Sequence, residues 1–226
     1  MKKFFAVIAV AFASVVVANA QIGIVAGVTS STAKIDKENI ENNMSGIDQY
    51  HVGVALKLPL PLGFAIQPEL LYQIKGADLK ETYYKLGEGA EIETSSWNTK
   101  SGFAELGIGI QWGLDLVAFR PFVFAKPFVG YMINGEGEYN GAADVLKEGT
   151  DKYLEDAKNK LEYGFSVGAG LELLEHFQLS FEFFNNLGQM FDEGQFNKDK
   201  ATEAVVNNYK DLENYTGFKV TLGFLF

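Results

Sequence analysis

Apolar and polar side chains alternate with a period of two in many segments of this chain. In the last of these, bulky apolar residues occupy the even positions from 218 to 226, while glycine, lysine and threonine occupy the odd positions from 217 to 223. A period of two predicts a β-strand that is apolar on one face and polar on the other. The pattern predicts about eight strands, at 22–29, 50–58, 64–74, 102–112, 121–133, 161–174, 177–186 and 215–226.

One predicted strand, 121–133, has less distinct faces than the others. Phe122, Phe124 and Phe128 share a side with Lys126, so aromatic rings and a charge fall on the same face. The alternation is therefore a weaker guide in this segment than in its neighbours.

The connections between the predicted strands are alternately long and short. Outer-membrane barrels combine short periplasmic turns with long extracellular loops, whereas a soluble β-sandwich has no reason to do so. We therefore predict an all-β fold, an eight-stranded antiparallel transmembrane β-barrel with long extracellular loops, short periplasmic turns and both termini on the periplasmic side. The long connections are 30–49, 75–101, 134–160 and 187–214, and the short ones are 59–63, 113–120 and 175–176.

Some of the long connections carry local patterns of their own. Apolar residues recur at helical spacing in 143–160 and in 200–213, which is compatible with short helices or with strands that continue beyond the membrane. For 77–100 we favour continuing strands, because the Gly-Glu-Gly sequence at 87–89 is typical of a hairpin tip.

The N-terminus has the three parts of a secretory signal peptide. Lys2 and Lys3 precede an apolar run at 4–17, and Ala18 and Ala20 form a small-residue cleavage site. The apolar run is shorter than the stretch of about 20 residues that a transmembrane helix needs. We therefore predict a signal peptide at 1–20, Sec export, and a barrel domain at 21–226 in the Gram-negative outer membrane.

Composition narrows the possible chemistry. The chain has no cysteine, which excludes disulfides, iron–sulfur clusters and thiol nucleophiles. Its 19 basic and 29 acidic residues give a net charge of −10, and removal of Lys2 and Lys3 leaves 17 basic residues and a net charge of −12. Such a charge disfavours nucleic acid as a partner.

The polar faces of the predicted strands collect charged residues that would point into the barrel. Charges removed from water need partners, and eight strands enclose little more than their own side chains. We therefore expect an internal network of salt bridges and hydrogen bonds; the alternative is a cation-lined pore or a proton-coupled gate, for which interior glycines leave some room. The predicted lumen charge network comprises Lys57, Glu69, Glu105, Lys126, Glu172, Glu182 and Lys219.

The sequence offers little support for catalysis or metal binding. His51 lies near Asp48 and Ser45, a combination found in small outer-membrane enzymes, but no Gly-x-Ser-x-Gly motif accompanies it. With two separated histidines, no cysteine and no EF-hand spacing in the acidic loops, we expect no metal site and no cofactor. We predict that the protein is not an enzyme.

The segment 67–76 resembles the third strand of the PorT-like outer-membrane β-barrel proteins, small barrels of the OmpX and OmpA type. The matching residues are Pro68, Glu69, Leu70, Tyr72, Lys75 and Gly76. The short turn at 59–63 and the terminal Phe226 also fit, whereas in the next strand only Glu105 and the aromatic and aliphatic character of the family's usual motif are kept. The resemblance implies an eight-stranded barrel, a secretion-system role for the namesake, and a terminal Phe226 that serves as the signal for barrel assembly.

Together these observations predict a structural or surface-interaction role through the extracellular loops. The alternatives are a secretion-system accessory barrel, by analogy with the namesake, and a narrow solute or ion channel. The expected partners are outer-membrane lipid, the barrel-insertion machinery and a protein at the surface or in secretion, and we expect a monomer.

Overall fold

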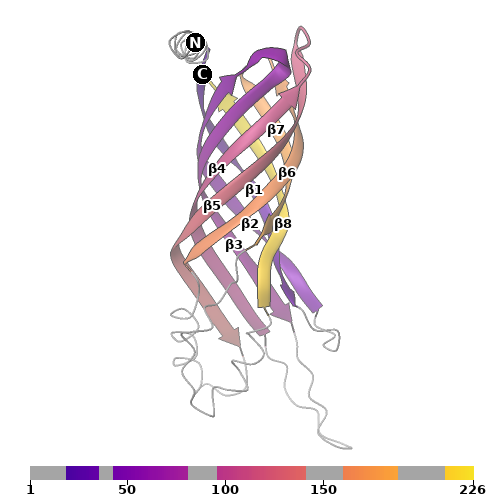
Figure 1. The fold of residues 1–226 in the computed structure, drawn as a ribbon. Coiled ribbons are helices and arrows are strands. Elements are labelled where there is room, and N and C mark those ends of the chain that lie inside the picture. The colour runs from indigo at the N-terminus through magenta and orange to yellow at the C-terminus, as the bar shows by residue number, and fades with distance from the viewer. Residues whose placement is uncertain (1–18, 36–42, 81–95, 141–159, 188–211) are drawn as a thin grey trace, which may run out of the picture.

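In the computed structural model, eight strands form a closed barrel in which every strand is antiparallel to both neighbours (Figure 1). The described residues are 19–35, 43–80, 96–140, 160–187 and 212–226. The barrel closes where β1 pairs with β8, and this fold confirms the predicted class. The strands are β1 Gln21–Ile35, β2 Asn43–Pro59, β3 Phe64–Lys80, β4 Ser96–Gly113, β5 Phe119–Asn140, β6 Leu161–Leu173, β7 Phe177–Asn186 and β8 Leu212–Leu225.

The two faces of the wall follow the predicted alternation. On β8, Phe218 and Val220 are exposed on the outside, while Lys219 between them is buried inside. The same arrangement recurs on β4, where Ile108 is exposed on the outside and Glu105 is buried. Because a bilayer replaces water around such a wall, the exposed apolar residues are the lipid-facing surface of the barrel.

The neighbouring strand β6 explains why phenylalanines lie on the inner face of β5, which the sequence left ambiguous. Phe122 and Phe128 are buried inside the barrel, and Phe124 is half-buried there. A methyl group added at Gly170 would overlap the ring of Phe122, and one added at Gly168 would overlap the ring of Phe124. The room that the sequence suggested beside these glycines is therefore filled by aromatic rings.

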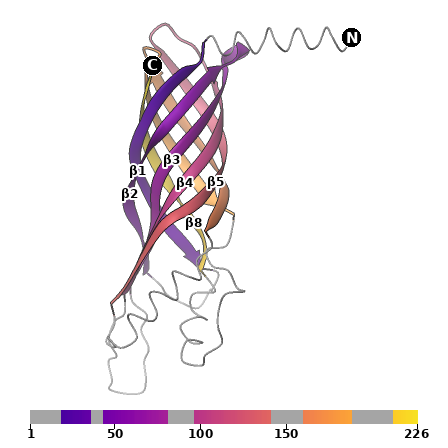
Figure 2. The ribbon, with the colours of Figure 1, turned by 90° about the vertical axis from the view of Figure 1, so that its left-hand side faces the viewer.

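The short turns and both ends of the described chain lie at one end of the barrel (Figures 1 and 2). The β2–β3 turn contains a short 3-10 helix, Pro61–Gly63, and the β6–β7 turn places Leu174 and Glu175 at positive φ (52° and 64°). These two adjacent positive values resemble a type I′ turn, although neither residue is the glycine or asparagine that such turns favour.

At the opposite end, strands continue further than predicted. The predicted connection 30–49 is partly strand, because β1 runs to Ile35 and β2 begins at Asn43. Outside the lipid both faces of a strand meet water, so the period of two is lost there. The predicted hairpin tip at 87–89 lies outside the described residues, as do most of the predicted helical segments 143–160 and 200–213.

Four neighbouring strands stay paired to one another at the end opposite the short turns. Asn43 pairs with Lys80, Lys80 with Ser96, and Ser96 with Asn140, so β2, β3, β4 and β5 form one sheet. By contrast, the ladder between β5 and β6 ends at the pair of Tyr131 with Leu161. We call residues 43–46, 76–80, 96–100 and 134–140 the projecting sheet; its β5 strand is visible in Figure 1.

Candidate functional site

The interior of the barrel holds equal numbers of positive and negative groups. In the described part of the chain, five basic and five acidic side chains are buried or nearly buried inside the wall. Their charges therefore sum to zero within the lumen. The basic residues are Lys57, Lys75, Arg120, Lys126 and Lys219, and the acidic residues are Glu69, Glu105, Glu162, Glu172 and Glu182.

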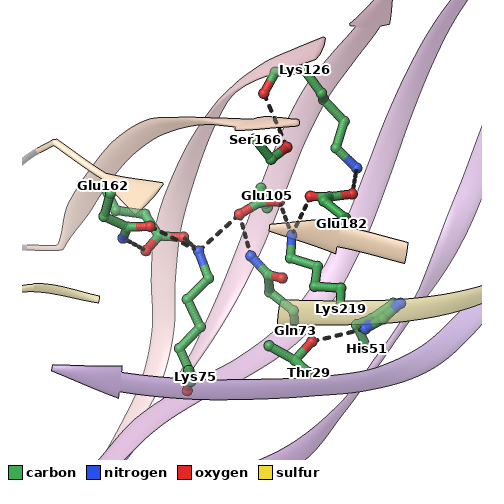
Figure 3. Close-up of polar contacts among 12 residues, drawn as sticks. Thr29, His51, Gln73, Lys75, Glu105, Lys126, Glu162, Ser166, Glu182 and Lys219 are labelled. Carbon is green, nitrogen blue, oxygen red and sulfur yellow. Dashed lines mark hydrogen bonds and ion pairs between the residues drawn. The ribbon is translucent and has the colours of Figure 1, made fainter. Parts of the chain in front are cut away.

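Two lysines and two glutamates form the middle of this network. Lys126 Nζ lies 2.8 Å from a carboxylate oxygen of Glu69 and 2.7 Å from one of Glu182. Glu182 also faces Lys219, whose Nζ is 3.4 Å from its other oxygen. The stem of Lys126 crosses Gly107, the position on β4 where a methyl group would touch it. Each charge in this group is thus balanced by a neighbour from another strand, and Figure 3 shows Glu182 between Lys126 and Lys219.

Glu105 connects two lysines of the network. Its two oxygens each lie 2.9 Å from a lysine, one from Lys75 and the other from Lys219. Gln73 Nε2 also donates a hydrogen bond to this carboxylate. Because Glu105 is completely buried, these three donors replace the water that would otherwise solvate its charge.

Lys75 carries the network toward the outer end of the barrel. Its Nζ lies 2.8 Å from Glu162 and 3.4 Å from the amide oxygen of Asn186, and Asn186 donates to Glu162 at 2.6 Å. Aromatic rings enclose the same ammonium group, which favours the cation electrostatically. Their centroids lie 4.6–5.5 Å from Nζ and belong to Phe103, Phe128 and Phe184.

A second group of charges lies at the periplasmic end. Lys57 Nζ is 2.5 Å from Glu172, which also accepts a hydrogen bond from Gln178 at 2.9 Å. Arg120 lies 4.0 Å from the same carboxylate, and its Nε is 3.0 Å from Asp115 in the β4–β5 turn. This group therefore links the interior to the short turns.

Glutamine side chains join the two groups. Arg120 donates to Gln111 at 3.3 Å, and Gln111 donates to Gln67 at 2.9 Å. Gln67 in turn donates to Glu69 at 2.8 Å, and Glu69 belongs to the middle group. One continuous set of polar contacts thus runs through the interior from the periplasmic turns to Lys75.

All seven residues of the predicted lumen charge network lie in this set. The prediction omitted three charged members, although each occupies an inward position of its strand. Lys75 follows Gln73 at the strand period, Glu162 precedes Gly164 by two, and Arg120 precedes Phe122 by two. Extending the inward parity to the true strand ends would have found Arg120 and Lys75; Glu162 was already within a predicted strand.

The histidines have structural contacts. His51 is buried inside the wall, with Nδ1 2.8 Å from the hydroxyl of Thr29 and Nε2 2.9 Å from that of Thr221. It therefore faces the barrel interior, whereas Asp48 is exposed. His176 Nδ1 lies 2.9 Å from the backbone oxygen of Leu225, which joins the β6–β7 turn to β8.

The remaining predicted residues lie at the ends of the chain. Phe226 donates its backbone N–H to the carbonyl of Ile22 at 2.7 Å, and its ring contacts that of Phe224. Its role as an assembly signal stays a prediction. Ala18 lies outside the described residues and Ala20 immediately precedes β1, so signal cleavage also stays a prediction.

The arrangement is suited to filling the barrel rather than to chemistry on a substrate. Every charged member has an opposite charge within 4.0 Å, and the spaces beside the β6 glycines hold aromatic rings. Among the described residues, no cluster of three or more histidine, aspartate or glutamate side chains has a geometry that could hold a metal ion.

Some solved barrels have a similar fold, although their sequences are distant. Neisserial surface protein A has 9% identity and a TM-score of 0.44, over 92% of this chain and 97% of that one. Ail of Yersinia pestis, in complex with the heparin analogue sucrose octasulfate, has 9% identity and a TM-score of 0.42, over 92% and 99%. OprG from Pseudomonas aeruginosa has 8% identity and a TM-score of 0.38, over 92% and 94%. No curated protein matches the sequence.

The family comparison is more informative. Residues 12–192 match the family described as outer membrane protein beta-barrel domain, which supports the predicted small outer-membrane barrel. The narrower PorT-like assignment stays a prediction. The match covers most of the chain and agrees with the closed barrel and its apolar outer wall. The chain therefore belongs to the outer membrane protein β-barrel domain family and lies in the outer membrane.

Proposed function

We propose that this protein is a non-enzymatic surface-interaction barrel whose projecting sheet binds an extended segment of a partner protein. The observation that carries the proposal is the outer part of β5, residues 134–140, which pairs with β4 but with no described strand on its other side. An edge strand of this kind offers a row of backbone donors and acceptors to an incoming strand.

The filled interior supports a binding role over a transport role. Five positive and five negative groups cancel, so the lumen has no excess charge to select an ion. The charged groups are also fixed by contacts from several strands, which makes the wall a rigid support for the sheet above it. We therefore expect planar bilayers that contain the protein to conduct no more than bilayers without it; a stable conductance step would favour the narrow channel.

The pairing of the projecting sheet makes it a suitable platform. Its middle ladder continues that of the barrel wall, because β3 and β4 stay in register from Phe64 with Trp112 to Lys80 with Ser96, whereas the β2–β3 and β4–β5 ladders each shift register where the sheet begins. A partner strand added to β5 would thus extend a sheet that is already anchored in the membrane. Backbone pairing would supply affinity, and the side chains of the partner would supply specificity.

A proline scan of the edge tests this proposal. Successive residues of a strand direct their N–H groups to opposite sides, so one of the two variants Gly135→Pro and Glu136→Pro removes a donor from the side of β5 that faces away from β4. The matched controls are Gly135→Ala and Glu136→Ala, which keep the donor. A photoactivatable residue at the exposed position 134 reports contacts in intact cells, and the same label at 160 serves as the off-sheet reference.

We expect a crosslinked product at position 134 that one proline variant loses and both alanine variants keep. Folding of each variant is checked by its resistance to unfolding in detergent at room temperature. If both proline variants fold and keep the crosslink, the partner does not use the β5 edge. Loss of secreted cargo in a deletion strain, restored in full by the proline variant that loses the crosslink, would instead favour the secretion-accessory role of the PorT namesake.

A further inference from the structure

The outer part of β5 has two chemically different faces. In residues 135–140, Gly-Glu-Gly-Glu-Tyr-Asn, glycine and tyrosine alternate with glutamate and asparagine. Gly135 pairs with Ser101, which is buried inside the barrel, whereas Glu136 pairs with Lys100, which is exposed. Because paired residues lie on the same face of a sheet, the odd positions continue the inner face of the wall and the even positions continue the outer face.

The outer face of this edge is acidic. Glu136 and Glu138 are two residues apart and therefore adjacent on that face. The row of paired residues that continues from Glu138 across the projecting sheet consists of Asn98, Asp78 and Ser45. Within the described strands, this row thus contains two acidic residues and no basic residue. A strand that pairs with β5 would meet this negative charge directly.

The inner face of the same edge is apolar. Tyr139 ends a row that crosses all four strands of the projecting sheet and contains only large apolar or aromatic residues. The other members of the row are Trp97, Leu79 and Met44. Beside Tyr139 on this face, positions 137 and 135 are both glycine. Glycine within a strand often marks a place where another backbone approaches closely, which fits an added strand at this edge.

The charge of the edge separates the candidate occupants. In an antiparallel pair of two β5 strands centred on Gly137, Glu136 of each copy would lie opposite Glu138 of the other copy. Like charges directly opposite each other destabilise a strand pair. A second copy of the chain is therefore a poor occupant, and the net charge of −10 of each chain acts in the same direction.

We propose that the occupant of the β5 edge is an extended protein segment in which basic residues alternate with apolar ones. This inference rests on the proposed function, because it names the chemistry of the segment that the edge would bind. The basic residues lie opposite Glu136 and Glu138, and a large apolar residue lies opposite Tyr139, where it continues the apolar row. Backbone bonds to β5 do not depend on sequence, so the two faces supply the specificity.

Binding of designed peptides to the purified protein in nanodiscs of zwitterionic lipid tests the proposal. The probe is fluorescein-labelled Thr-Lys-Val-Lys-Phe-Lys-Val-Lys-Thr, which reads the same in both directions and can therefore pair with β5 in either. In a second peptide glutamate replaces every lysine, and in a third serine replaces the valines and the phenylalanine. Fluorescence polarisation measures the dissociation constant of each peptide.

Two protein variants separate binding at the edge from attraction to an acidic protein as a whole. Glu136→Gln/Glu138→Gln removes two charges from the edge. Asp48→Asn/Glu175→Gln removes the same charge from exposed positions outside the projecting sheet. The two variants Gly135→Pro and Glu136→Pro are measured as well, and folding is checked for each protein as above.

We expect the lysine peptide to bind about tenfold more tightly than the glutamate peptide, and more tightly than the serine peptide. Glu136→Gln/Glu138→Gln should reduce the preference for lysine, whereas Asp48→Asn/Glu175→Gln should not, and one of the two proline variants should weaken binding. The proposal is overturned by equal affinities for the lysine and glutamate peptides, or by no binding of any peptide to folded protein. An equal loss in the two charge variants, or unchanged binding in both proline variants, overturns it too.

The peptide assay and the crosslink at position 134 distinguish this inference from the proposed function. If the crosslink forms in cells and one proline variant loses it, but the protein does not prefer the lysine peptide, the surface-interaction role stands and the inferred chemistry is wrong. If the lysine peptide binds at the edge but no crosslink forms in cells, the proposed function is contradicted and the inferred chemistry of the edge stands.

Discussion

The outer and inner faces of the barrel wall differ in how narrowly each position restricts the residue that can occupy it. On the outer face, Ile108 and Val167 lie among other apolar side chains and contact lipid, so almost any apolar residue would serve. On the inner face, Glu105 meets two lysines and a glutamine at defined atoms. The outer face therefore depends on composition, whereas the inner face depends on particular pairs and on their geometry.

The largest effect is expected from breaking an inner pair. Glu105→Ala leaves Lys75 and Lys219 buried with fewer partners, and we expect a loss of about 3–5 kcal/mol in the free energy of unfolding. Glu105→Gln, which keeps the shape and part of the hydrogen bonding, should lose less. Urea unfolding of protein in lipid vesicles measures both. If Glu105→Ala loses no more stability than Ile108→Ala, the inner face does not depend on particular pairs more than the outer face does.

A charge on the outer face is expected to have the next largest effect. Ile108→Lys places an ammonium group against hydrocarbon, and we expect a loss of about 2–4 kcal/mol in the free energy of unfolding near the bilayer midplane. Ile108→Leu is the control and should change little. The same vesicle assay applies, and an equal loss for both variants would show that residue 108 is packed specifically rather than solvated by lipid.

Packing on the inner face can be tested without changing any charge. At Gly170 an added methyl group overlaps the ring of Phe122 and lies 2.7 Å from the carbonyl oxygen of Leu179, so Gly170→Ala should lose about 1–3 kcal/mol of stability. At Gly109 the nearest atom is 3.3 Å away, on Gln67, so Gly109→Ala should lose less. Equal stabilities in parallel urea titrations would contradict the view that rings fill the spaces beside the β6 glycines.

The smallest effect is expected in a turn, where neither lipid contact nor packing in the lumen restricts the choice of residue. Glu175 has a φ of 64°, a conformation that asparagine tolerates better than glutamate. Glu175→Asn should therefore stabilise the barrel by less than about 1 kcal/mol, because the gain concerns one backbone position. Glu175→Ala, which has no preference for this conformation, is the comparison. A thermal unfolding midpoint that is higher for alanine than for asparagine would argue against the turn geometry.

The fold could be predicted because lipid requires an apolar residue at every outward-facing position. That rule placed five of the predicted segments wholly within the correct strands, overran two others by one residue, and failed to separate the faces of β5. Phenylalanine suits lipid and a packed lumen equally well, so Phe122 and Phe124 could not be assigned from their own chemistry. The glycines of β6 that accept these rings become informative only once the two strands are known to pair. The outer strand ends were not predicted because the alternation of apolar and polar residues is lost where a strand leaves the lipid.

The site could be predicted only in part. Alternation shows which charged residues face inward, and it would also have included Lys75 and Arg120 if the strands had been drawn to their full length. It does not show which charges meet. Lys57 contacts Glu172 across the lumen from β2 to β6, and this contact depends on the stagger of the strands in the closed barrel.

The neutrality of the interior also constrains how this protein can evolve. A substitution that adds or removes one charge leaves another group without a partner, and selection disfavours that step. Inherited changes at Lys57 and Glu172, or at Lys126 and Glu182, should therefore occur together, and related sequences should show compensating exchanges at these pairs. Outer positions such as Val167 should instead vary independently among apolar residues.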